Sequence, residues 1–335
     1  MLRAAYLLAL PVLAACAPVS GENGSGADAS ADATGTLFVA NKRGNTLSKI
    51  DLASGEEIKR LDSCTNPHEL ATSPDGKYVA LACYGGQWVA IFNSDDLSEH
   101  RVLDLGDNAR PHGIVWHDSG TIYVTAEGRR SIFRIVSPLE DSHLTEFATG
   151  QQGSHMIAVS PDENTAWTTD LGSKTVTRID LTSGARRSVT VGEEPEGISL
   201  APDGGALWVS ARGSNQAFEL DPDSMEVRHT VETGRFPLRL AIRPQGDVAI
   251  TSDLADGSLS VIDLETRDVV RTIVVSGPDE AAGRFQVTIL WSQDGTHIYV
   301  AETASDTVAE IDYESGEVRR RLHVGAGGDG MAILN

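Results

Sequence analysis

Residues 197–209 read GISLAPDGGALWV, and this stretch decides the fold. Two short apolar segments, 197–200 and 206–209, flank the turn Ala201–Gly204. Proline presets the backbone φ angle and Asp-Gly tolerates a tight turn, so the stretch predicts two strands joined as a hairpin. The alternation of apolar and polar residues within such segments is typical of strands with one buried face.

The same turn returns along the chain at spacings of about 40–50 residues. Its other copies are Ser73–Gly76, His117–Gly120, Ser160–Glu163, Arg243–Gly246 and Ser292–Gly295. After each hairpin comes a polar loop and then a third strand, which often ends in Ile-Asp-Leu or a close variant, as at 50–52, 179–181, 262–264 and 311–313. A further turn leads to a fourth strand, such as Glu317–Arg320. A four-stranded unit repeated with this period predicts the blades of a β-propeller.

The two ends of the repeat predict how the ring closes. The body opens at Thr36 with the second, third and fourth strands of a blade, and it ends at Gly330–Leu334 with a strand of the first type. We therefore expect the last strand to complete the first blade. Six whole repeats and this shared one predict an all-β domain over residues 36–335, a single seven-bladed propeller with four-stranded blades. Closure removes free sheet edges to which another chain could pair, and we expect a monomer.

Three strands carry a family resemblance. Tyr123–Ala126, Phe38–Asn41 and Tyr299–Glu302 resemble the repeat of the YVTN β-propeller family, and the likeness extends over nearly all of residues 36–335. The resemblance implies the propeller fold but no particular activity, because such propellers serve many roles. Lactonase-type and streptogramin-lyase-type propellers hold metal ligands at the mouth of the channel, but their ligand patterns have no residue-by-residue match in this sequence.

The first 15 residues are typical of a lipoprotein signal peptide. Arg3 provides a positive charge, and the apolar stretch Ala4–Leu13 is too short for a permanent membrane span. The stretch ends in Leu-Ala-Ala-Cys, which resembles the pattern read by lipoprotein signal peptidase and implies a lipid on Cys16. An ordinary signal peptide followed by a chance cysteine is the open alternative.

Residues 16–35 are small, polar and acidic, which predicts a flexible, lipidated tether. We expect the protein on the periplasmic side of a bacterial envelope, in contact with the membrane only through this lipid. The outer membrane is favoured over the inner one because Ala17, and not Asp, follows the cysteine. The net charge of −21 argues against nucleic-acid binding, which needs a basic surface.

Histidines recur at one position of the repeat. The first strand of each blade lines the channel of a propeller, and its entry lies on one face, which we call the upper face. The residues at the entries are, in chain order, His68, His112, His155, Glu196, Leu238, Val287 and Asp329. Three consecutive blades thus present a histidine and the next presents a glutamate, which predicts a binding site at the upper mouth of the channel.

The loops between the second and third strands should reach the same face. They begin with Asn41, Tyr84, Glu127, Asp170, Arg212, Asp253 and Glu302. We expect the carboxylates of Glu127, Asp170, Asp253 and Glu302 to lean toward the mouth and, with Asn41 and Arg212, to orient the histidines from behind. Such a ring suits a divalent metal (zinc, copper or calcium) held by His68, His112 and His155. A polar ligand or partner site without metal, and purely structural histidines, stay open as alternatives.

Two cysteines, Cys64 and Cys83, are expected near His68 on the upper face. An even number of cysteines in an oxidising compartment predicts a disulfide between them. The alternative is a copper or zinc site formed with His68.

Three functions follow from these residues. The leading hypothesis is an envelope-anchored propeller that binds a small polar ligand, a metal or an envelope protein at its upper channel mouth. The alternative is a metal-dependent hydrolase or lyase, similar to lactonases, centred on the three histidines. The third is a periplasmic redox or metal-handling accessory protein, suggested by cysteines close to histidines. No catalytic residue is identified by a motif.

Overall fold

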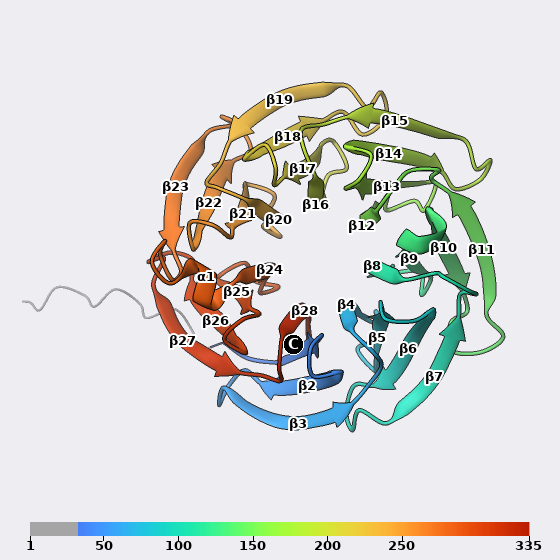
Figure 1. Ribbon diagram of the computed structural model, residues 1–335, viewed down its shortest axis with the longest axis horizontal. Coiled ribbons are helices and arrows are strands. Elements are labelled where there is room, and N and C mark those ends of the chain that lie inside the picture. Colours follow the sequence, from blue (N-terminus) through green and yellow to red (C-terminus); the bar gives the residue numbers. More distant parts are fainter. Residues whose placement is uncertain (1–32, 335) are drawn as a thin grey trace, which may run out of the picture. The chain divides into compact units, whose positions relative to one another are not determined.

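The computed structural model describes residues 33–334, in which seven antiparallel sheets of four strands form a ring around a central axis, and we keep the word channel for the space between the inner strands (Figure 1). The predicted all-β, seven-bladed propeller is confirmed. The expected signal peptide, Cys16 and the tether up to residue 32 lie outside the described residues.

The four strands of each blade run in order from the channel outward. Blade one holds β28 (Gly328–Leu334), β1 (Thr36–Asn41), β2 (Thr46–Asp51) and β3 (Glu56–Asp62). Blade two holds β4 (Pro67–Thr72), β5 (Tyr78–Cys83), β6 (Trp88–Asn93) and β7 (Glu99–Asp104). Blade three holds β8 (Pro111–Trp116), β9 (Ile122–Ala126), β10 (Ser131–Val136) and β11 (His143–Ala148). Blade four holds β12 (Ser154–Val159), β13 (Thr165–Asp170), β14 (Thr175–Asp180) and β15 (Arg186–Thr190).

Blade five holds β16 (Pro195–Leu200), β17 (Leu207–Ala211), β18 (Gln216–Leu220) and β19 (Val227–Glu232). Blade six holds β20 (Pro237–Ile242), β21 (Val248–Asp253), β22 (Ser258–Asp263) and β23 (Val269–Val274). Blade seven holds β24 (Gln286–Trp291), β25 (His297–Glu302), β26 (Thr307–Asp312) and β27 (Val318–His323). The short helices η1 (Glu127–Arg129) and α1 (Ala281–Arg284) lie in loops. Within residues 33–334, no helix has the length and apolar character needed to span a membrane.

The ring closes through the C-terminal strand, as the sequence predicts. Strand β28 pairs with β1 in antiparallel register, with Phe38 opposite Ala332 and Val39 opposite Met331. The last strand of the chain is therefore the inner strand of blade one, next to the first strand that the structure describes (Figure 1).

The apolar core lies between the blades. Seven clusters of buried apolar side chains occur among the described residues, one at each blade–blade interface. At one of them, Phe38 of blade one packs with Phe92 of blade two. At another, Trp208 of blade five packs with Ile262 of blade six. Each blade is apolar on both faces, so it needs a neighbour on each side to bury them.

Every inner strand carries a β-bulge at the same place. In blade two, Pro67 pairs with Cys83 and Leu70 pairs with Leu81, so two residues of β4 oppose one residue of β5. The same shift occurs in the other six blades. A bulge leaves its extra residue outside the ladder and re-aims side chains, so the second and third residues of each inner strand are those displaced at the upper face.

The residue before each inner strand has a positive φ angle in all seven blades. These residues are Asn66, Arg110, Gly153, Glu194, Phe236, Phe285 and Gly327. Five of the seven are not glycine, although the left-handed conformation costs such residues about 1 kcal/mol. The shared conformation turns the chain from the rim of the upper face into the channel.

Deletion of residues 328–335 should destabilise the whole domain, because it exposes the inner edge of β1 and removes the neighbour that covers blades two and seven. We expect a cooperative thermal transition in the parent protein and a much lower or absent one in the truncated chain.

A permuted chain that carries residues 328–334 before Thr36, joined by a short turn, is the control. It restores the same pairing, so its melting temperature should return close to that of the parent. If the truncated chain melted like the parent, closure by β28 would not support the ring.

Candidate functional site

The upper mouth of the channel brings the three predicted histidines together. They occupy the second positions of β4, β8 and β12, inside the bulges. The ring centroids of His68 and His112 lie 4.7 Å apart, and those of His112 and His155 lie 3.7 Å apart. The Tyr84 ring completes the group at 4.5 Å from His68 and 5.5 Å from His112.

His155 is held by two carboxylates. Its Nδ1 bonds Glu127, and its Nε2 lies 3.3 Å from Oε1 of Glu196. The Thr125 hydroxyl on blade three donates to the backbone oxygen of His155 on blade four at 2.7 Å, which fixes the strand as well as the ring. Burial opposes the charged imidazolium, but the bonds to Glu127 and Glu196 outweigh it and raise the pKa of His155. Both ring nitrogens are thus engaged.

His112, in the centre of the arc, has the opposite character. It is only 2% exposed, and its Nδ1 has no hydrogen-bond partner. Burial, followed by the charges of His155 and His68, holds the pKa of His112 well below its usual range. Burial likewise lowers the pKa of His68. The arc therefore joins one histidine that favours the charged form to two that favour the neutral form.

Arg239 reaches across the channel to blade two, and no feature of the sequence pointed to it. Its Nη2 donates to Glu69 of blade two at 2.9 Å, and its Nη1 donates to Glu196 of blade five. Arg239 itself belongs to blade six, so one guanidinium joins three blades. All three side chains are at least nine-tenths buried. We call this buried group of Glu69, Glu196 and Arg239 the charged floor.

The two carboxylates around Arg239 have different ionisation. Burial works against the Glu196 anion, but Arg239, His155 and Arg212 overcome it and lower the pKa of Glu196 to about 2. Burial dominates at Glu69 and raises its pKa, with a further contribution from the negative charge of Asp329, although Arg239 and His155 act in the opposite direction. Glu196 therefore carries the fixed charge of the floor.

A close approach of backbones makes this floor possible. Gly197 follows Glu196 in the bulge of β16, and a Cβ at this position would collide with the backbone of Leu240 and Arg239 in β20. Only glycine lets the two inner strands approach so closely. Gly197 therefore brings Glu196 within reach of Arg239.

The rest of the mouth is both polar and apolar. The Lys42 Nζ lies 3.1 Å from Oδ2 of buried Asp329, whose Oδ1 has no hydrogen-bond partner. In blades six and seven, Leu238 and Val287 occupy the same second positions and are buried. Small-molecule sites commonly combine apolar walls with a few oriented polar groups of this kind.

Tyr84 connects the mouth to the rim of the upper face. Its hydroxyl donates to Oε2 of Glu127 at 2.7 Å and accepts a hydrogen bond from Nη2 of Arg110. Burial, and then the negative charge of Glu127, raises the pKa of Tyr84 to about 12. Tyr84 therefore stays a neutral donor to the carboxylate that holds His155.

Of the six residues expected to stand behind the histidines, the structure brings two to the mouth. Glu127 contacts His155, and Arg212 donates to Glu196. Both follow directly after the last ladder residue of their strand, as Tyr84 does. The other four, Asn41, Asp170, Asp253 and Glu302, are themselves the last residues of β1, β13, β21 and β25. Successive strand side chains point to opposite faces, so this offset of one residue turns the four away from the mouth.

These four side chains form hydrogen bonds inside their own blades. Asp170 accepts from the hydroxyls of Ser154 at 2.8 Å and Thr177 at 2.6 Å. Asp253 accepts from Thr251 and Ser260, Asn41 donates to Thr46 and Ser48, and Glu302 accepts from Thr307 and Arg321. They tie the second strand of a blade to its neighbours.

The predicted disulfide between Cys64 and Cys83 is present, with the Cα atoms 5.7 Å apart. It joins the loop before β4 to the end of β5, and Tyr84 follows directly. The bridge therefore supports the two segments that carry His68 and Tyr84.

The described residues contain no group of three or more His, Cys, Asp or Glu side chains placed to hold a metal ion. His155 has both nitrogens bonded to carboxylates, so it presents no free lone pair in this arrangement. Metal binding by His68, His112 and His155 stays a prediction.

Several buried polar atoms near the start of the inner strands lack a hydrogen-bond partner. Among residues 33–334, ten buried side-chain nitrogen or oxygen atoms lack a hydrogen-bond partner. Five belong to the first three residues of inner strands: His112, Arg239, Gln286, Thr288 and Asp329. Proteins pair the great majority of buried polar groups, so the unpaired atoms of His112, Arg239 and Asp329 are candidates for a partner that the described residues do not supply.

The sequence is similar to a known β-propeller family and to two curated proteins. Residues 2–335 match the family described as YNCE-like beta-propeller. The chain belongs to this family. A curated relative of this YNCE-like propeller is virginiamycin B lyase of Nocardia farcinica, 27% identical over 45% of this chain and 51% of the lyase. Another is protein NirF of Pseudomonas aeruginosa, 25% identical over 69% of this chain and 64% of NirF. The chain spans less than two thirds of either relative.

Solved structures repeat the fold at low sequence identity. A functionally unknown protein from Desulfotomaculum acetoxidans superposes with a TM-score of 0.77 at 13% identity, over 90% of this chain and 99% of that one. The dihydro-heme d1 dehydrogenase NirN, in complex with DHE, superposes with a TM-score of 0.63 at 18% identity, over 86% and 63%. These likenesses concern the propeller fold alone.

Substitution Arg239→Met should destabilise the YNCE-like propeller strongly. It leaves the buried carboxylate of Glu196 without its main counter-charge and removes a bridge across the channel. We expect the free energy of unfolding, measured by urea denaturation, to fall by about 3–5 kcal/mol. Arg129→Met, which removes the exposed bridge to Glu146, is the matched control and should cost less than about 1 kcal/mol. Equal losses in the two variants would contradict the role given to Arg239.

Asp253 should produce a pH-dependent loss of stability. Burial raises its pKa from the ordinary 3.8 to about 7, so the folded protein holds a proton that the unfolded chain has released. Stability must then fall as the pH rises through this interval. Asp253→Asn cannot ionise, so its unfolding free energy should fall less between about pH 4 and pH 7. Urea denaturation of both proteins across this range checks the difference, and parallel curves would refute it.

Proposed function

We propose that this YNCE-like propeller is a binding protein that holds a small polar ligand at the upper mouth of its channel. The observation that carries the proposal is the set of unpaired buried polar atoms on His112, Arg239 and Asp329, which belong to the inner strands at the mouth. Unpaired donors and acceptors bind a polar molecule by completing their hydrogen bonds.

The unpaired groups define the ligand's chemistry. The Nε–H of Arg239 donates, Oδ1 of Asp329 accepts, and Nδ1 of His112 does either, depending on its tautomer. A matching molecule therefore carries both donors and acceptors. The apolar side chains of Leu238 and Val287 favour a molecule with one less polar edge.

The relatives support a role in handling small molecules. NirN shares the fold and has been solved in complex with DHE. The relative named virginiamycin B lyase favours a second candidate, a metal-dependent lyase or hydrolase centred on His68, His112 and His155. That candidate requires a bound metal, which makes it separable by measurement. The disulfide beside His68 supports the third candidate, a redox accessory role, only if its bond exchanges with thiols.

We further propose that the propeller acts on the periplasmic side of the envelope, attached through a lipid on Cys16. The disulfide Cys64–Cys83 supports an oxidising compartment, because such bonds persist there. The proposed ligand site lies within one chain, so the proposal is of a monomer.

Thermal-shift measurements on the full-length protein test the binding function. The probes are amino acids, sugars, polyamines, dicarboxylates and phosphate esters, each measured against wild type and His112→Gln. We expect at least one class to raise the melting temperature of wild type, and the rise to be lost in His112→Gln. Intact-mass spectrometry of the same preparation should show the diacylglyceryl addition at Cys16.

The control is His143→Gln, an exposed histidine on the outer strand β11, which should respond like wild type. Elemental analysis of the same samples separates the alternatives, because a stoichiometric metal that is lost in His112→Gln would favour the lyase or hydrolase. If no probe class shifted the wild-type transition, the proposed binding function would fail.

A further inference from the structure

A hollow of about 400 Å³ opens on the upper face, and Tyr84, which contacts His68 and His112, lines it. It is lined by Asn66, Tyr84, Gln87, Asn108 and Arg110, together with the two glycines after Tyr84. These residues come from the loops on both sides of blade two and from the loop between β5 and β6. The hollow therefore lies on the rim of the mouth, over the disulfide-bonded part of the ring.

The charge of this hollow is the reverse of the protein's. None of its lining residues is acidic, and Arg110 is its only charged group, in a chain with a net charge of −21. Its other polar groups are side-chain amides, the Tyr84 hydroxyl and exposed peptide groups. A concave surface with one cation and no carboxylate attracts an anion, despite the net charge of the molecule.

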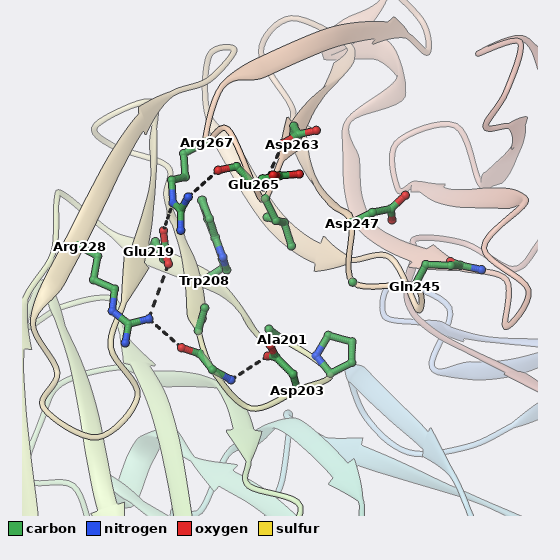
Figure 2. A pocket seen from close by; sticks show the side chains of 15 residues that line it. Ala201, Asp203, Trp208, Glu219, Arg228, Gln245, Asp247, Asp263, Glu265 and Arg267 are labelled. Carbon is green, nitrogen blue, oxygen red and sulfur yellow. Dashed lines mark hydrogen bonds and ion pairs between the residues drawn. The ribbon is translucent and has the colours of Figure 1, made fainter.

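A hollow between blades five and six, lined by the turns that follow their inner strands, shows the contrast (Figure 2). It has a volume of about 540 Å³ and five acidic residues among its lining. Its two arginines already face Glu219, with Arg267 donating to this carboxylate at 2.9 Å and Arg228 lying 3.7 Å from it. The two arginines of this hollow are thus paired with a carboxylate, whereas Arg110 of the upper hollow is not.

Contacts with Tyr84 orient Arg110 and leave other N–H groups of its guanidinium without a partner among the described residues. Its guanidinium carbon lies 4.5 Å from the centroid of the Tyr84 ring, and Nη2 donates to the Tyr84 hydroxyl. No carboxylate of the described residues lies within ion-pair distance of Arg110. A guanidinium oriented by one contact keeps its other N–H groups for a planar, two-point bond with an oxyanion.

Tyr84 connects this hollow to the histidine mouth. It lines the hollow, and its ring also contacts His68 and His112. An oxyanion on Arg110 therefore lies one aromatic ring away from the unpaired Nδ1 of His112. One elongated molecule can occupy both places, with its anionic end in the hollow and its polar end in the mouth.

We infer that the ligand of the upper face is a small organic anion whose oxyanion is bound by Arg110. This inference rests on the proposed binding function and names the class of ligand. The oxyanion is a carboxylate or a phosphate ester, since both match the guanidinium. A free phosphate ion satisfies Arg110 alone, whereas an organic anion also reaches the mouth.

Isothermal titration calorimetry of the full-length protein tests the inference with succinate, glycerol 3-phosphate and inorganic phosphate, at constant ionic strength in chloride. We expect succinate or glycerol 3-phosphate to bind, and to bind more tightly than inorganic phosphate. Arg110→Gln should weaken that binding at least about tenfold. Arg129→Gln, an arginine of the same face that already pairs with Glu146, should bind like wild type.

Two outcomes would overturn the inference, and both differ from failure of the proposed function. In one, a neutral or cationic probe binds in a manner sensitive to His112→Gln while the anions do not, so a ligand site exists but is not anionic. In the other, the anions bind equally well to wild type and Arg110→Gln, so Arg110 is not their site. If no probe of any charge binds, the proposed function fails and the inference fails with it. Circular dichroism of Arg110→Gln, unchanged from wild type, would exclude a folding defect.

Discussion

The structure depends on the pairing of β28 with β1. Every blade buries apolar side chains on both of its faces, so no blade is stable without two neighbours, and an open row would leave two faces exposed to water. Pairing at one point of the ring removes both exposed faces together. It also sets blade one against blade two, where a Cβ on Gly330 would collide with the backbone of His68. The positions of the histidines at the mouth therefore follow from closure.

Closure also sets the distance over which charges meet across the channel. Arg239 reaches Glu69 from a strand on the far side of the ring, and this contact places a buried ion pair across the channel. A buried guanidinium between two carboxylates is costly to desolvate, and it is tolerated when each partner bonds it directly. Arg239 and its two carboxylates thus link the stability of the ring to the shape of the site.

Part of the site was predictable because it follows the repeat. His68, His112, His155 and Glu196 share one register position, and the structure places all four at the mouth. Glu69 and Arg239 share the next position, but the same place holds glycine in Gly113, Gly197 and Gly330, so the repeat gave no reason to select them. Charged residues in a position that holds glycine in three of the seven blades were the available signal. The sequence could not show which residues after the second strand reach the mouth. A shift of one residue along the strand decides whether a side chain faces the mouth or its own blade.

The sequence by itself determined the strands, their number, the closure and the disulfide, because turn chemistry, the two-residue period and cysteine pairing are local or follow the repeat. The tertiary structure alone decided which side chains meet at the channel. Residues 69 and 239 are 170 positions apart, and their contact depends on the ring radius and on bulges that no single blade specifies. The same holds for ionisation, since burial and neighbouring charge act through space: three histidines with equal places in the repeat have pKa values shifted in opposite directions.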